Sequence, residues 1–160
     1  MAVIKRNEMF TGWSQNDVSE FLIFIIECFH KSMPKPYHIV ISGIDTNDVD
    51  RNAMICYKML QEQYEREYSE IFDIFYAIRI SEITSLDKVN IYSKKPEEFF
   101  ILDLPIPSNV DNVTIIHCLD LLTNCERLDN ESSWYNGITK THQSVCKKLS
   151  FWSLPKILVV

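Results

Sequence analysis

The stretch WSQNDVSEFLIFIIECFH, residues 13–30, restricts the fold most, because it is a long helical pattern that is apolar nearly all round. One side repeats at the helical spacing of three and four residues, through Val18, Phe21, Leu22, Ile25, Ile26 and Phe29. The opposite side carries Ile23, Phe24 and Cys28. A helix of this kind is normally enclosed by other elements. We therefore expect it to be buried in the middle of a domain.

Two acids, Asp17 and Glu20, stand at the start of this helix. Ser14 is the predicted N-cap, with Asp17 three residues on as a short version of the capping box. At positions i and i+3 the two carboxylates share one face of the first turn, where the helix dipole favours negative charge. Two explanations stay open. Either Asp17 completes the cap and Glu20 is a solvated acid, or the pair holds a cation supplied by a partner.

Helical patterns recur in three later stretches. Asn47 or Thr46 caps a predicted amphipathic helix over residues 48–67, and residues 69–75 begin as a helical turn. A short helix is expected in TIIHCLDLLTNC, residues 114–125. The patterns that favour strands follow these helices or lie between them. They cover residues 76–81, 99–107, 144–152 and 156–160, whereas residues 129–141 are polar and typical of a loop.

Helices that precede strands predict an α+β fold rather than an alternating α/β one. The chain has 160 residues, enough for one domain, and is 46% hydrophobic and 24% charged, as packed globular proteins are. A net charge of −6 argues against a nucleic-acid partner. The longest apolar run, residues 21–26, is too short to span a membrane, and the first residues have no secretory apolar region.

Chemistry-bearing side chains form no convincing local site. Five cysteines, an odd number without C-x-x-C spacing, are expected to be reduced thiols in the cytoplasm or nucleus, each most often a small buried side chain. Four histidines are the candidate bases, but neither His117 beside Cys118 nor His142 near Cys146 has a spacing that predicts a nucleophile–base pair. We expect no catalytic residue, no metal site and no cofactor from these patterns.

Three stretches together resemble the ubiquitin-specific proteases, which are papain-like cysteine deubiquitinases. GWSQNDVSEFLIFIIECFH is similar to the family's G-x-x-Q-Q-D-A-x-E-F-L segment, and SEIFDIFYAIRISEIT to its S-x-I-x-D-L-F segment. EEFFILDLPIP and the final residues up to SFWSLPKILVV resemble F-x-x-L-x-L-P-I-P and the long W-Y-C-x-x-C-K-x-H-Q…L-P-x-I-L-V-I run. Residues 34–67 match least.

The resemblance implies a partial catalytic domain over residues 1–160. Residues 12–68 would be the helical thumb part, and residues 69–160 the β-rich fingers and palm. In the family the catalytic Cys lies before the Q-Q-D segment and the catalytic His beyond the L-P-x-I-L-V-I strand, so both boxes are expected to be missing here. The family's zinc-binding C-x-x-C pairs also have no counterpart, because Asn136, Thr139 and the run 85–88 stand at those positions.

For the acid pair, the resemblance implies contact with the arginine-bearing C-terminal tail of ubiquitin. Gln15, Asp17 and Glu20 match the family residues of that contact, whereas Asn16 departs from its second Gln. The implied function is thiol-dependent hydrolysis of isopeptide bonds at the C-terminus of ubiquitin, with ubiquitin or ubiquitinated proteins as partners. The alternatives are a catalytically inactive ubiquitin-binding module, or a gene remnant that does not fold alone.

Overall fold

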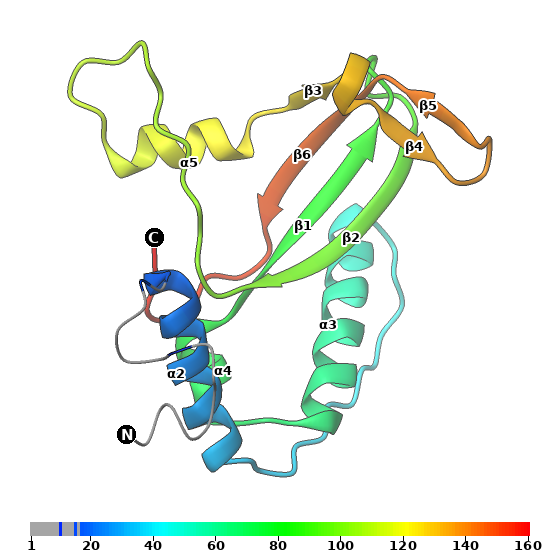
Figure 1. Cartoon of the computed structure of the whole chain (residues 1–160). Helices are drawn as coiled ribbons and strands as arrows, with labels where there is room; N and C mark the ends of the chain where they lie inside the picture. Colours follow the sequence, from blue (N-terminus) through cyan, green and yellow to red (C-terminus); the bar gives the residue numbers. More distant parts are fainter. Residues whose placement is uncertain (1–9, 11–14, 16) are drawn as a thin grey trace.

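Helices precede a curved antiparallel sheet in the computed structural model (Figure 1), which describes Phe10, Gln15 and residues 17–160. This order agrees with the α+β prediction. The helices are α2 (Val18–Ser32), α3 (Asp48–Arg66), α4 (Glu70–Phe75), α5 (Ile115–Thr123) and the 3-10 turn η1 (Asn130–Ser132). The strands are β1 (Ala77–Thr84), β2 (Ile91–Phe99), β3 (Glu126–Leu128), β4 (Trp134–Asn136), β5 (Thr141–Gln143) and β6 (Val145–Phe151).

The main sheet has the strand order β2-β1-β6-β3, and β4 and β5 form a separate hairpin. All three pairings in the sheet are antiparallel. Strand β1 lies between two long neighbours, so its backbone is paired on both sides. Strand β2 has only β1 beside it, which explains how it accommodates Pro96: a proline cannot donate to a ladder but is tolerated at a sheet edge.

Both faces of β1 are covered, which gives the molecule two small cores. Ile78 and Ile80 pack with Cys56 of α3 on one face. Ala77 packs with Phe99 and Leu102 on the other face, where side chains of α5 join them. Because successive strand residues point to opposite faces, one strand serves both cores.

The prediction that the apolar helix is fully enclosed is wrong. Within α2 only Ile26 and His30 are buried, whereas Val18 is 79% exposed and Phe29 is 52% exposed. The helix packs on α4, and Phe10 packs edge to face on Phe21 in its first turns, with ring centroids 5.3 Å apart. These neighbours cover only part of its circumference. No helix in the described part of the chain is long and apolar enough to cross a membrane.

Several strand predictions need correction. Residues 100–107 and 156–160 do not form strands: Phe99 ends β2, and beyond it the described chain has one parallel bridge, between Ile101 and Val159. The sheet instead uses the polar segment of β2, which the alternation pattern missed. The predicted polar loop at 129–141 contains η1 and β4. In β4 the Trp134 ring stacks on Tyr92 of β2, with centroids 5.7 Å apart, which holds the β4–β5 hairpin against the sheet.

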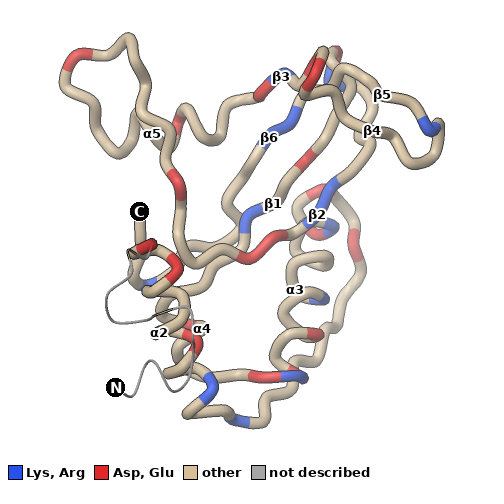
Figure 2. Tube along the Cα trace, viewed as in Figure 1, with Lys and Arg blue, Asp and Glu red and all other residues tan. Residues whose placement is uncertain are grey.

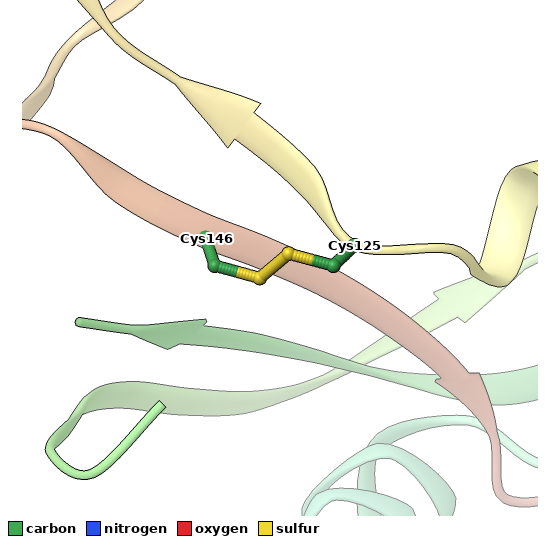
Figure 3. Close-up of a disulfide and its surroundings, with 2 residues drawn as sticks. All are labelled: Cys125 and Cys146. Carbon is green, nitrogen blue, oxygen red and sulfur yellow. A yellow bond between two sulfur atoms is a disulfide. The ribbon is translucent and has the colours of Figure 1, made fainter. Parts of the chain in front are cut away.

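The expectation that all five cysteines are reduced is also wrong. Cys125 and Cys146 form a disulfide across 21 residues of sequence, with Cα atoms 5.8 Å apart (Figure 3). The sheet register brings the two cysteines near each other. Arg127 lies opposite Cys146, and Cys125 is two residues before Arg127. Cys28, Cys56 and Cys118 are free thiols. Of these Cys56 and Cys118 are buried, as expected for small apolar side chains.

Candidate functional site

The start of α2 is capped by Asp17. Its Oδ1 accepts hydrogen bonds from the backbone N–H of Ser19 at 2.7 Å and of Glu20 at 3.2 Å. The predicted cap, Ser14, lies outside the described residues, and the helix begins at Val18. Asp17 itself therefore caps the helix, whereas the sequence pattern predicted Ser14 as the N-cap with Asp17 in support.

The cap leaves charge available at the surface. Both amides bond to Oδ1 of Asp17, and Oδ2 has no hydrogen bond within the described part of the chain. Glu20 is exposed, and its carboxylate makes no hydrogen bond to any residue that the structure describes. Gln15 is exposed as well. These three side chains are accessible to another molecule.

An open cleft of about 460 Å³ runs beside the same face of α2. Ser19, Ile23 and Glu27 of α2 line one wall. The opposite wall comes from the end of α4, from β1 and from the chain around the end of β2, with Tyr76, Arg79, Glu98, Phe99, Phe100, Ile101 and Asp103. Glu20 lies three residues before Ile23 and seven before Glu27, so it shares this helical face. The acid at the helix start and the cleft are thus on one side of α2.

The cleft is negatively charged. Glu98 and Asp103 line it without an ion-pair partner among the described residues, whereas Glu27 Oε2 is 3.3 Å from Lys31 Nζ. The single cation in the lining, Arg79, has its Nε 3.1 Å from Glu97 Oε2. Burial, together with the charges of Glu98 and Glu27, raises the pKa of Tyr76 to about 12. Figure 2 shows acidic positions both at the start of α2 and along the segment that leaves β2. A cationic ligand is the kind that this surface favours.

Three of the four histidines, His30, His117 and His142, make contacts with other residues of the fold. His30 lies between Ser69, whose Oγ is 2.7 Å from Nδ1, and Glu67, whose Oε2 is 3.2 Å from Nε2. His117 completes the capping box of α5, and His142 Nδ1 is 3.3 Å from Ser133 Oγ. Among the described residues, no histidine is hydrogen-bonded to a cysteine thiol. Sequence reasoning missed the His30–Ser69 contact because 39 residues separate the two side chains.

At the positions where the resemblance places zinc-binding pairs, one turn is closed by a side-chain oxygen and the other by a backbone carbonyl. Asn136 Oδ1 accepts from the N–H of Ile138 at 2.9 Å and of Thr139 at 3.3 Å. The other turn is closed by the Lys88 N–H, which donates to the Ser85 carbonyl at 2.8 Å. In the residues that the structure describes, no group of three His, Cys, Asp or Glu could hold a metal ion. Both turns are therefore held by hydrogen bonds within the chain.

Comparisons with known proteins agree on one family. The family model described as ubiquitin carboxyl-terminal hydrolase matches residues 1–160. Ubiquitin carboxyl-terminal hydrolase 2 of Gallus gallus is 30% identical over 152 residues, which is 94% of this chain and 42% of that protein. The Rattus norvegicus protein of the same name is 28% identical over 158 residues, and the match covers 94% of this chain and 24% of that protein. This chain thus spans less than half the length of these relatives.

A solved structure gives the same result for the fold. It is the structure of the SAGA DUB module, Ubp8, Sgf11, Sus1 and Sgf73, bound to monoubiquitin. One chain of it matches 98% of this chain with a TM-score of 0.60 and 22% identity, and the match covers 29% of that chain. At this identity the likeness concerns the fold alone. Because the family model matches residues 1–160, this chain belongs to the ubiquitin carboxyl-terminal hydrolase family.

Proposed function

We propose that this chain is the substrate-binding part of a ubiquitin-specific protease, in which it holds the arginine-bearing tail of ubiquitin against α2. The observation that carries the proposal is the negative cleft beside α2, with two exposed acids at its helical start. The family name, which refers to hydrolysis at the carboxyl terminus of ubiquitin, and a structural neighbour bound to monoubiquitin support the choice of ligand.

In this proposal Asp17 has two roles that do not compete. Its Oδ1 caps the helix, and its Oδ2 accepts a charge-assisted hydrogen bond from an arginine guanidinium of the tail. Glu20 presents a second carboxylate one turn further along, and Gln15 adds an amide donor and acceptor. Ile23 and Phe100 offer apolar surface for the aliphatic parts of the bound segment.

The reaction of the whole enzyme would be thiol-dependent acyl transfer. A cysteine thiolate attacks the carbonyl of the isopeptide bond, the lysine amine leaves with a proton from a histidine, and water then hydrolyses the thioester. The share of this chain is to position the tail and screen its charge. Correct placement of a scissile bond is itself a large contribution to catalysis.

The alternative is a ubiquitin-binding module without catalysis. It is favoured by the structural contacts of the histidines, since none of them is hydrogen-bonded to a cysteine thiol in the described residues. Assay of the full chain on a fluorogenic amide of ubiquitin distinguishes the two. Turnover that Cys118→Ser abolishes without loss of thermal stability assigns hydrolysis to this chain and contradicts the module, whereas tail binding without turnover supports the module.

The tail contact is tested by Asp17→Asn combined with Glu20→Gln. Asparagine keeps a side-chain acceptor for the cap, so thermal stability should change little while two charges are lost. Binding of labelled ubiquitin should weaken and become less dependent on salt. The matched control, Asp111→Asn with Glu131→Gln, removes two exposed charges far from the cleft and should bind like the parent. Parent-like binding by the Asp17 and Glu20 variant would contradict the proposal.

A further inference from the structure

The two sulfurs of the disulfide differ in accessibility. Cys125 is exposed, in the segment between α5 and β3, whereas Cys146 is only 3% exposed, within β6. Figure 3 shows the bond joining these two segments. Cys125 is therefore the half of the disulfide that lies at the surface, where a thiol from solution arrives. Since thiol–disulfide exchange depends on access to the attacked sulfur, attack at Cys125 is favoured.

A cavity of about 410 Å³ has Cys125 among its lining residues. Its lining is largely apolar, with Pro105, Leu121, Leu122 and Leu149. It also includes one amide, one acid and one base, which are Asn124, Glu126 and Lys147. Its volume is within the range of small-molecule sites, about 300–1,000 Å³. Glu126 and Lys147 lie opposite each other in the β3–β6 register, so both charges occur at the same level of the sheet.

We propose that Cys125 is a site of thiol–disulfide exchange with a small peptide thiol of the glutathione class, whose body occupies this cavity. Such a thiol carries carboxylates and an ammonium group, which match Lys147 and Glu126, on a backbone that can bond to Asn124. A bare alkyl thiol would use none of these groups.

The exchange is balanced in electrons and protons. The peptide thiolate attacks Sγ of Cys125, a new S–S bond forms, and the pair of electrons of the old bond leaves with Sγ of Cys146, which then takes a proton from solvent. A second peptide thiolate attacks the peptide sulfur of the mixed disulfide and releases Cys125 as a thiol. Overall the protein disulfide is reduced by two electrons, and two peptide thiols are oxidised to a peptide disulfide.

The exchange changes how the sheet holds its edge. Strand β3 pairs with β6 through only three residue pairs, and the disulfide is the covalent link next to them. Once the bond is cleaved, the segment after α5 is retained by those few pairs alone. The site therefore connects thiol concentration to the attachment of β3, whereas α5 stays packed on the core through Leu119 and Leu122.

The test starts from the full chain carrying Cys28→Ser, which removes the partly exposed free thiol. The oxidised protein is incubated with reduced glutathione, quenched with acid, blocked with N-ethylmaleimide and mapped by mass spectrometry. We expect a glutathione adduct on Cys125 and a blocked free thiol on Cys146. An adduct on Cys146, or a starting protein in which both thiols are already free, overturns the proposal.

Matched variants test the two parts of the proposal separately. With oxidised glutathione, Cys146→Ser should acquire an adduct at Cys125, and Cys125→Ser should stay unmodified at Cys146. Lys147→Gln should slow exchange with glutathione by about threefold, as expected for one partly exposed charge pair, without slowing exchange with mercaptoethanol. Lys148→Gln, on the neighbouring residue, should change neither rate. Equal slowing of both thiols by Lys147→Gln overturns the role of the cavity.

Discussion

Helix α2 and strand β2 contrast most clearly in how composition relates to burial. The helix is built almost entirely from apolar residues, yet its Val18 and Phe29 are largely exposed. The strand has the polar sequence IYSKKPEEF, yet it is paired along its whole length with β1. Periodicity decides which element a segment can form, but burial depends on the neighbours that the fold places around it. The helical side and the sheet should therefore respond differently to the same substitution.

The largest expected effect comes from comparing isoleucine truncations in the two regions. Ile80 of β1 packs against α3 and is 3% exposed. Ile80→Ala should cost about 2–5 kcal/mol, because buried apolar surface is lost and a cavity is left. Ile23 is 38% exposed on α2, and Ile23→Ala should cost about 1 kcal/mol or less. Chemical denaturation measures both. Equal losses would show that α2 is packed as tightly as the sheet.

The sequence predicted elements whose signals are local. The extents of α3, α5 and β6 agree with the patterns, and Asn47, one of two candidate caps, does cap α3, with its Oδ1 accepting from the Asp50 N–H at 2.9 Å. Strand β2 was missed because its alternation is interrupted by charges and by Pro96, which only an edge position tolerates. Residues 156–160 have strand composition but find only one bridging partner, at Ile101. Strand formation depends on such long-range partners.

The candidate site divides in the same way. The acid pair was found from the sequence because capping residues act within one turn. The opposite wall of the cleft was not found, because Arg79, Glu98 and Asp103 come from segments more than fifty residues further along the chain. The Cys125–Cys146 pair was missed for the same reason, since it depends on the pairing of β3 with β6. No local pattern encodes the meeting of distant segments.

The second effect tests whether the exposed helix depends on its cap. Asp17→Ala removes the acceptor for two backbone amides and should cost about 0.5–2 kcal/mol. Asp17→Asn retains an acceptor and should cost far less, so the difference isolates the hydrogen bonds from the charge. Thermal denaturation of both variants gives the measurement. If both variants melt at the same temperature as the parent, the cap at the start of α2 adds nothing to stability.

A smaller effect concerns alkaline pH, where the helical side should weaken first. The hydrogen bond from Tyr68 to Asp73 of α4, 2.7 Å long, raises the pKa of Tyr68 from 10.0 to about 12, with burial adding to the shift. The unfolded chain loses this proton near pH 10 while the folded chain keeps it, so stability is full below pH 10 and falls as pH rises to about 12.

Tyr68→Phe checks this assignment. It should cost about 1 kcal/mol at neutral pH, the net value of one hydrogen bond, and should flatten the decline between pH 10 and pH 12. Denaturant titrations at several pH values measure the slope. An unchanged slope in the variant would assign the alkaline decline to other groups, such as Tyr76, whose pKa is raised by burial to about 12.

The smallest effect lies in the sheet, where charge rather than apolar area joins neighbouring strands. Lys94 Nζ of β2 is 2.6 Å from Glu82 Oε2 of β1, and Lys148 of β6 stands opposite the same glutamate. The side chains of the pair are about a quarter exposed, so its coupling should be near 0.2–1 kcal/mol and weaker in high salt. Because Glu82 faces two lysines, Glu82→Gln should cost more than Lys94→Gln. A double-mutant cycle at two salt concentrations measures the coupling. Zero coupling at both salt concentrations would mean that the Lys94–Glu82 pair does not help to hold β2 at the sheet edge. The backbone pairing, the Arg79–Glu97 pair and the few buried side chains of β2 would then hold the strand. This polar pair would contribute as little to the sheet as the exposed apolar face of α2 contributes to the core.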